Sequence, residues 1–148
     1  MPITSFLASE TEGDMPLTSF PNGIKVAAYN EAASATISVG AEETNVVNVA
    51  IQLTDGAGDN LDNQAAVIAY LSDAATGAGL ATTAADTVAI GTDGVLAEIV
   101  SGQVYVLISD ATGAVDINVT QDAADTLYLI LLLPSGKVVA SSVLTFTT

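Results

Sequence analysis

The stretch Val115-Asp-Ile-Asn-Val-Thr120 alternates strictly between aliphatic and polar residues. Successive side chains of a β-strand point to opposite faces, so a period of two predicts a strand with one buried and one solvated face. The segment Val46–Leu53 repeats the pattern, with Asn48 and Gln52 on its polar side. Its apolar side carries Val47, Val49, Ile51 and Leu53.

Further segments with strand character recur between turns rich in Gly, Asp and Asn. The expected strands cover residues 35–39, 46–53, 65–71, 87–90, 96–100, 103–109, 115–119, 126–133 and 138–146. The Ala-rich segment 64–75 would also suit a helix, and residues 82–86 carry no clear pattern. Strands about 8–12 residues apart with turns between them are typical of a sandwich or barrel. We therefore predict an all-β, immunoglobulin-like antiparallel β-sandwich over residues 35–148.

The last two expected strands carry further information. Residues 126–133 begin with β-branched and aromatic residues and continue as an apolar run, which favours a central strand. Residues 138–146 are interpreted as one strand, in which Ser141 and Val143 share a face opposite Ser142 and Leu144. A tight turn at 134–136 connects the two.

An irregular segment precedes the sandwich. Residues 1–34 hold three of the four prolines and a short repeat, in which Met1-Pro-Ile-Thr-Ser-Phe6 recurs as Met15-Pro-Leu-Thr-Ser-Phe20. The acidic stretch Glu10–Asp14 separates the two copies. We interpret residues 1–34 as an extended N-terminal arm that docks on a neighbouring subunit; the alternatives are a disordered terminus or a first strand of the domain. The expected partner-binding side chains are Ile3, Phe6, Leu7, Leu17 and Phe20.

The charge balance is strongly acidic. Seventeen Asp and Glu residues oppose only Lys25 and Lys137, which gives a formal net charge of −15. Phosphate-rich surfaces are bound through clustered Lys and Arg, so we expect neither nucleic acid nor a membrane as partner. A basic protein surface, a cation or no charged partner remain open, and net charge of this sign also serves solubility.

We expect neither a signal peptide nor a membrane-spanning segment in this sequence. The first residues have no basic n-region and no long apolar h-region, so no signal peptide is expected. The longest apolar run, 127–134, is too short to cross a bilayer. We expect synthesis in the cytoplasm.

The residue types that catalysis usually needs are missing. The sequence has no His and no Cys, and both of its cations are lysines. A nucleophile–base pair therefore lacks its usual base, and a pair of carboxylates would lack the Arg and Trp that line sugar clefts. We predict no enzyme and no cofactor. The acidic turn Asp55–Asn63 is the best calcium candidate, but Asp, Asn and Gly also form turns, and we predict no metal site.

Several stretches of the sequence together carry a resemblance to a known protein family. They are Val46–Asp55, Ala89–Gly94, Asp116–Thr120, Leu127–Lys137 and Val139–Phe146. Their sequence of strands and turns, over residues 46–148, is similar to immunoglobulin-like β-sandwich proteins encoded among the head genes of tailed bacteriophages. Some of these are bacteriophage capsid decoration (cement) proteins. The resemblance implies a virion protein on the capsid exterior that binds across capsomer boundaries, often as a trimer.

The residues and the resemblance together lead to one main hypothesis. We expect a structural virion protein that decorates a phage head, binds the major capsid protein, clamps neighbouring subunits and forms a homo-oligomer, with a trimer favoured. The first alternative is a head-fibre, tail or cell-surface adhesion module that binds carbohydrate. The second is a calcium-stabilised extracellular module.

Overall fold

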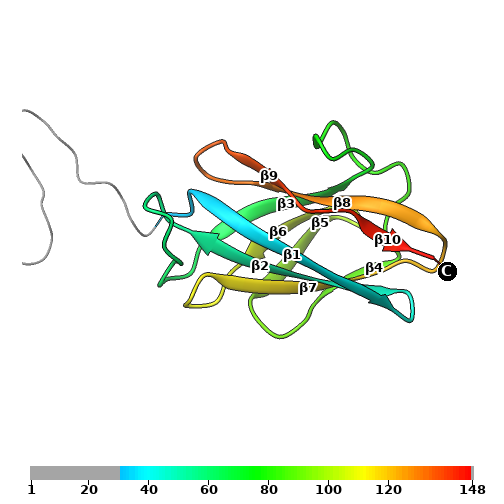
Figure 1. Cartoon of the computed structure of the whole chain (residues 1–148), viewed down its shortest axis with the longest axis horizontal. Helices are drawn as coiled ribbons and strands as arrows, with labels where there is room; N and C mark the ends of the chain where they lie inside the picture. Colours follow the sequence, from blue (N-terminus) through cyan, green and yellow to red (C-terminus); the bar gives the residue numbers. More distant parts are fainter. Residues whose placement is uncertain (1–30, 148) are drawn as a thin grey trace, which may run out of the picture.

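The computed structural model describes residues 31–147. This part contains ten strands and no helix, and therefore no helix that could cross a membrane. The strands are β1 (Ser34–Glu43), β2 (Val46–Thr54), β3 (Ala66–Ser72), β4 (Thr87–Ile90), β5 (Val95–Val100), β6 (Val104–Ile108), β7 (Ala114–Thr120), β8 (Asp125–Leu132), β9 (Val138–Ala140) and β10 (Leu144–Phe146). Figure 1 shows them stacked in two layers, with β3, β8 and β9 in one and β2 and β7 in the other.

Both layers are antiparallel sheets. One has the strand order β1-β2-β7-β4, and the other has the order β10-β8-β3-β6-β5 with β9 also paired to β8. The alternating segments from the sequence are paired with each other, because Val49 of β2 lies opposite Ile117 of β7. The segment 64–75 contains strand β3 and is not helical. The prediction of an all-β, immunoglobulin-like antiparallel sandwich is confirmed.

The prediction of a single last strand is wrong. Residues 138–146 form two short strands, β9 and β10, that both pair with β8 but in registers that differ by one residue: Ile130 opposes Ala140, and Leu127 opposes Leu144. The cause lies at Ser141, whose Oγ accepts a hydrogen bond from the Leu129 amide at 2.9 Å in place of a backbone carbonyl. The resulting bulge moves Leu144 to the buried side that Ser141 already occupies.

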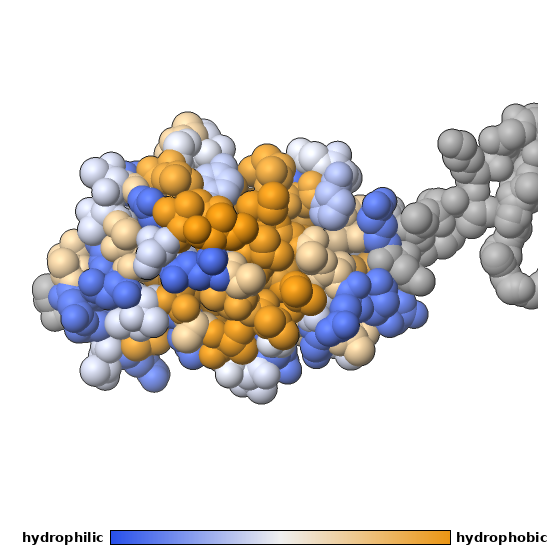
Figure 2. Space-filling view, turned by 180° about the vertical axis from the view of Figure 1, so that it is seen from behind, coloured by the Kyte–Doolittle hydropathy of each residue, from blue (hydrophilic) through white to orange (hydrophobic). Residues whose placement is uncertain are grey.

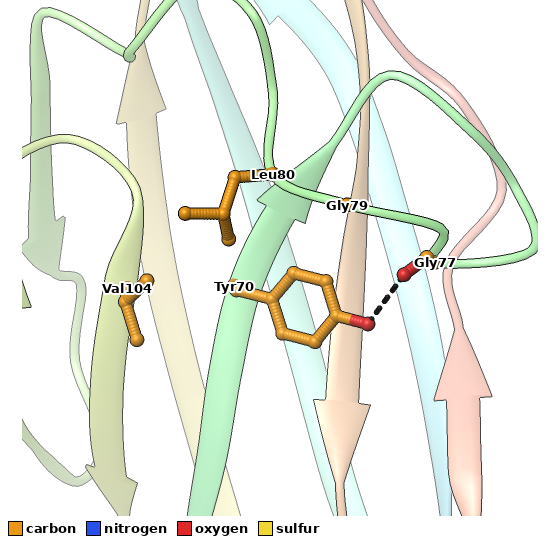
Figure 3. Close-up of a pocket in the computed structure, with 5 residues that line it drawn as sticks. All are labelled: Tyr70, Gly77, Gly79, Leu80 and Val104. Atoms are coloured by element: carbon orange, nitrogen blue, oxygen red, sulfur yellow. Dashed lines mark hydrogen bonds between the residues drawn. The ribbon is translucent and has the colours of Figure 1, made fainter.

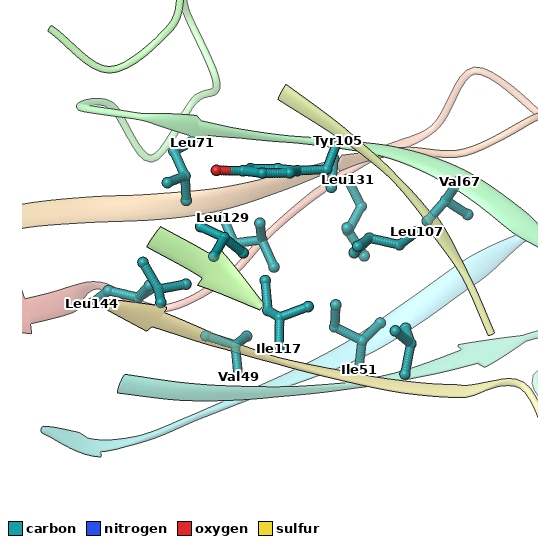
Figure 4. Packing of buried hydrophobic residues seen from close by; sticks show 14 of the residues in the cluster. Val49, Ile51, Val67, Leu71, Tyr105, Leu107, Ile117, Leu129, Leu131 and Leu144 are labelled. Atoms are coloured by element: carbon teal, nitrogen blue, oxygen red, sulfur yellow. The ribbon is translucent and has the colours of Figure 1, made fainter. Parts of the chain in front are cut away.

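The core fills the space between the two sheets (Figure 4). Every second residue of the central strands points inward, and in β8 these are Leu127, Leu129 and Leu131, all fully buried. Tyr105 of β6 is the largest buried side chain, and its hydroxyl has no hydrogen-bond partner among the described residues. Burial, aided by the Glu98 charge, raises the pKa of Tyr105. The core thus consists of aliphatic side chains and the rings of Tyr105 and Phe146.

The N-terminal side of the domain closes against β9 and β10. Lys137 Nζ donates a hydrogen bond to Ser34 Oγ at 2.9 Å, and Thr147 donates to the Glu42 carboxylate. Ala32 is buried, and the Ala33 amide bonds to the Thr54 carbonyl, so these residues pack with the sandwich. Most of the predicted arm, residues 1–30, lies outside the described residues, and the arm stays a prediction.

Candidate docking face

The outer side of the β8-β3-β6-β5 sheet carries an uninterrupted row of apolar side chains. The pairing places Ala97, Val106, Ile68, Leu132 and Val138 next to one another across five strands. Three of them are substantially exposed: Ile68 by 44%, Leu132 by 38% and Val138 by 49%. An antiparallel sheet usually has a solvated, polar outer face, so this row departs from the expected pattern.

The rows on either side are apolar as well. They consist of Val100, Val104, Tyr70, Ile130 and Ala140 on one side, and of Val95, Ile108 and Ala66 on the other. We call these eight residues and the five of the central row, thirteen in all, the apolar face. None of them carries a charge. Figure 2, which views the molecule from behind, shows apolar side chains gathered across the middle of that side and hydrophilic ones concentrated at both ends.

A loop after β3 forms a hollow on the apolar face. The hollow has a volume of about 280 Å³ and is lined by Tyr70, Gly77, Gly79, Leu80 and Val104. Figure 3 shows the loop passing over the Tyr70 ring, whose hydroxyl donates a hydrogen bond to the Gly77 carbonyl at 2.7 Å. Tyr70 thereby fixes one wall of the hollow, while Leu80 and Val104 supply apolar walls.

Glycine is needed where this loop approaches the sheet. Gly77 has φ of 75°, and a Cβ there would lie 2.8 Å from Tyr70 Oη and 3.1 Å from Ile130 Cγ2. The close approach explains why Ile130 is fully buried although it points outward from the sheet. The hollow is therefore a defined part of the surface, with its shape set by backbone conformation.

The partner-binding residues predicted from the sequence are Ile3, Phe6, Leu7, Leu17 and Phe20, and all lie outside the described residues. They stay predictions. The apolar face was missed, although a signal for it exists. The runs 65–71 and 127–133 are continuously apolar instead of alternating, which is typical of strands covered on both faces.

The acidic turn considered for calcium is organised by its own hydrogen bonds. Asp55 Oδ1 accepts from the amides of Ala57 at 2.8 Å and Asp59 at 3.0 Å. Among residues 31–147, no three His, Cys, Asp or Glu side chains are grouped so that they could hold a metal ion. This geometry is that of a side-chain-stabilised turn.

One carboxylate organises the opposite sheet. Asp116 Oδ1 accepts hydrogen bonds from the Thr92 and Asp93 amides at 2.7 Å each, and Oδ2 accepts one from Asn48 at 3.1 Å. Burial raises the pKa of Asp116, but these hydrogen bonds outweigh it and lower the pKa below the usual value. Asp116 thus stabilises the turn between β4 and β5.

The tyrosines of residues 31–147 bear on the carbohydrate-binding alternative. Of the tyrosines in the described part, Tyr105 is buried in the core, and Tyr70 and Tyr128 are half-buried in β3 and β8. Carbohydrate-binding surfaces typically expose an aromatic platform. Among residues 31–147, no tyrosine is fully exposed.

Comparisons with known proteins give limited information. No protein-family model matches the chain, and no curated protein matches it. Among solved structures, the chain is similar to the cohesin module of a family 33 glycoside hydrolase from Clostridium perfringens ATCC13124. The sequence identity is 11%, the match covers 79% of this chain and 98% of the cohesin chain, and the TM-score is 0.44. The strand pairing of this chain itself defines its fold.

Proposed function

We propose that this protein is a non-catalytic structural module that works by docking on another protein. More specifically, we propose a virion decoration protein that binds the outer surface of a phage head and clamps neighbouring capsid subunits. The observation that carries the docking role is the apolar face. The molecule has a net charge of −15, yet this surface has no charge and is apolar. Burying it against a protein partner removes apolar area from water and therefore stabilises the complex.

The size of the apolar face bears on how it is used. The thirteen outward positions lie on five strands about 4.8 Å apart and are about 6.8 Å apart along each strand, so together they cover about 420 Å². A stable protein–protein interface buries about 800 Å² on each partner. The apolar face alone supplies about half of this area, so a lasting attachment calls for additional contacts. The predicted arm and a homotrimeric arrangement, which would place several faces on one target, are two sources of such contacts.

The charge distribution supports an exterior position on a capsid. The described residues include a single cation, Lys137. Packaged nucleic acid would therefore repel any surface of this protein that faced it. An acidic outer surface remains soluble while the apolar face is engaged. The absence of His and Cys from the sequence supports a structural role over an enzymatic one.

Binding to heads tests the proposal directly. Decoration-free heads would be assembled from the major capsid protein encoded in the same genome, and binding would be measured by co-sedimentation. We expect the wild-type chain to bind and the double variant Ile68→Asp/Leu132→Asp to lose at least tenfold in affinity, because two charges would have to be desolvated. The matched control, Thr36→Asp/Asn118→Asp, adds the same charge to the opposite outer face and should bind like the wild type.

Two results would overturn the proposal. If the wild-type chain does not bind the heads, the decoration role is wrong. If both double variants bind as tightly as the wild type, the apolar face is not the docking surface. A glycan array run on the same samples tests the carbohydrate-binding adhesion module, and strong glycan binding without head binding would favour that alternative.

A further inference from the structure

We infer that the partner of the apolar face, in the docking role proposed above, presents an aromatic side chain to the hollow and a Lys or Arg side chain to Asp73. The two side chains stand two residues apart on an extended segment of the partner. The inference rests on the proposed function and adds the chemistry of the partner to it. Two features of residues 31–147 carry it: an apolar hollow with room for a ring, and a carboxylate at its rim.

The hollow suits an aromatic ring. Its volume of about 280 Å³ exceeds the roughly 150 Å³ of an apolar cavity that accepts benzene. Its side-chain walls are the Tyr70 ring, Leu80 and Val104, and Leu80 is 46% exposed, so a partner can reach it from outside. A ring from the partner can pack against the Tyr70 ring, and such aromatic pairs gain more than the burial of their area alone.

The side chains that line the hollow offer little to a polar group. The Tyr70 hydroxyl donates its hydrogen to the Gly77 carbonyl at 2.7 Å, so it has none left for a polar group of the partner. Leu80 and Val104 have no polar side-chain atom. A buried polar group without a hydrogen bond costs free energy, whereas an apolar group gains free energy by leaving water. The hollow therefore selects an apolar side chain.

Asp73 is exposed and lies at the rim of the hollow. Its Oδ2 accepts a hydrogen bond from the Thr82 amide at 2.9 Å, and Thr82 is only two residues beyond Leu80. Two residues span at most about 7 Å, so the carboxylate lies within about 10 Å of the Leu80 backbone. Hydrogen bonds from the Thr82 side chain and amide lower the pKa of Asp73, which keeps this carboxylate charged at neutral pH.

The charge balance favours a basic residue beside the ring. Three of the seventeen acidic residues precede residue 31, so fourteen lie in the described part, where Lys137 is the single cation. A carboxylate has about four acceptor sites, so Asp73 can accept from Thr82 and from a cation together. In an extended segment, residues two apart point to the same side about 6.8 Å apart. An aromatic residue in the hollow thus places a Lys or Arg two positions away within reach of Asp73.

Short peptides test the aromatic part on the full chain. The first probe is the peptide Gly-Phe-Gly-Lys-Gly with blocked ends, and the second has Ala in place of Phe. In nuclear magnetic resonance titrations we expect the Phe peptide to shift the amide signals of Gly79, Leu80 and Val104, with a dissociation constant in the millimolar range. The Ala peptide should bind at least about fivefold more weakly, because it buries less apolar area. Leu80→Asp should abolish the shifts, because a charge replaces an apolar wall.

Exchange of the cation tests the rim. A peptide with Glu in place of Lys should bind several-fold more weakly, and this difference should shrink at high salt. Asp73→Asn keeps an acceptor for the Thr82 amide but removes the charge, so it should weaken binding of the Lys peptide several-fold. The matched control Asp59→Asn removes the same charge from an exposed turn and should leave binding unchanged.

Four results would overturn the inference. The aromatic part is wrong if the Phe peptide causes no shifts around the hollow, or binds no better than the Ala peptide. The basic part is wrong if the Glu peptide binds as well as the Lys peptide, or if Asp73→Asn and Asp59→Asn bind alike. Head binding is a separate assay. Heads that do not bind the chain overturn the decoration role, whereas peptide binding with the expected pattern still supports the inferred chemistry of the partner.

Discussion

The outer faces of the two sheets differ sharply, although both sheets pack on the same core. On the β1-β2-β7-β4 sheet, the outward positions include Thr36, Asn48, Gln52, Asp116 and Asn118. Asn48 bridges two of its neighbours, with 3.1 Å to Asp116 Oδ2 and 2.9 Å to Asn118 Oδ1. The outer face of the other sheet is the apolar face, whose three rows contain no charged residue.

The difference in polarity indicates which of the two outer faces is suited to contact with water. Cross-strand polar pairs stabilise a solvated sheet by satisfying each other and the surrounding water. Apolar rows gain nothing from water, and a patch of about 420 Å² is of the size that often marks an interaction site on a monomer. In the proposed function the two sheets have separate tasks: the outer face of the polar sheet is solvated, and the apolar face docks on a partner.

Adjacent leucines of β8 give the largest expected effect. Leu131 points into the core and is fully buried, whereas Leu132 lies on the apolar face and is 38% exposed. Leu131→Ala should lower the free energy of unfolding by about 2–5 kcal/mol, because it leaves a cavity in the core. Leu132→Ala should cost no more than about 1 kcal/mol, because its side chain is only partly buried.

Urea denaturation of both variants measures this difference. Equal losses of stability would mean that the apolar face is packed as tightly as the core, and the distinction between a docking face and a structural face would then fail.

Removal of the Asp116 side chain tests the polar sheet and ranks second. Asp116→Ala leaves the Thr92 and Asp93 amides without their acceptor, although both are near the surface and water can replace part of the interaction. We expect a loss of about 1–2 kcal/mol in the free energy of unfolding. Thermal and urea melts measure it, with Asp122→Ala as a control carboxylate on an exposed turn. An Asp116→Ala variant as stable as the wild type would show that the hydrogen bonds of Asp116 contribute no net stability.

Much of the fold was predictable from local pattern. The alternation at 115–120 gives β7, and residues 87–90 match β4 without adjustment. In each case the pattern depends only on which side of the strand faces the core. The two-strand end of the chain was not predictable, because the bulge depends on a hydrogen bond between Ser141 and Leu129, twelve residues apart.

The candidate docking face was only partly predictable. The continuous run 127–133 indicates a strand covered on both sides, but the sequence does not reveal that β5, β6, β3, β8 and β9 are neighbours. The row through Ile68 exists only because of the pairing between these strands. The hollow depends further on the positive φ of Gly77 and on the Tyr70 hydrogen bond, which are tertiary features.

A pH titration of stability measures the contribution of the Asp116 carboxylate. We expect a smaller effect than that of Asp116→Ala. Its pKa is lowered in the folded state relative to an unfolded value of about 3.9. Stability from this carboxylate is therefore fully present above about pH 4 and is lost as the pH falls through the folded-state pKa. We expect the stability gap between wild type and Asp116→Asn to be constant near neutral pH and to narrow below pH 4. A gap that widens on acidification would contradict the sign of the shift.

The smallest expected effect comes from Ile68→Thr, at the centre of the apolar face. Threonine is β-branched like isoleucine and suits a strand, so the free energy of unfolding should change by no more than about 0.5–1 kcal/mol. The reciprocal substitution on the polar sheet, Thr36→Ile at an exposed position of β1, should be equally mild.

The two variants should differ in retention on a hydrophobic-interaction column, where Ile68→Thr elutes earlier than the wild type and Thr36→Ile later. A loss of more than about 2 kcal/mol in Ile68→Thr would place its side chain in the structural core. A small loss with earlier elution would mean that Ile68 is held on the surface for a partner, since the fold does not need it there.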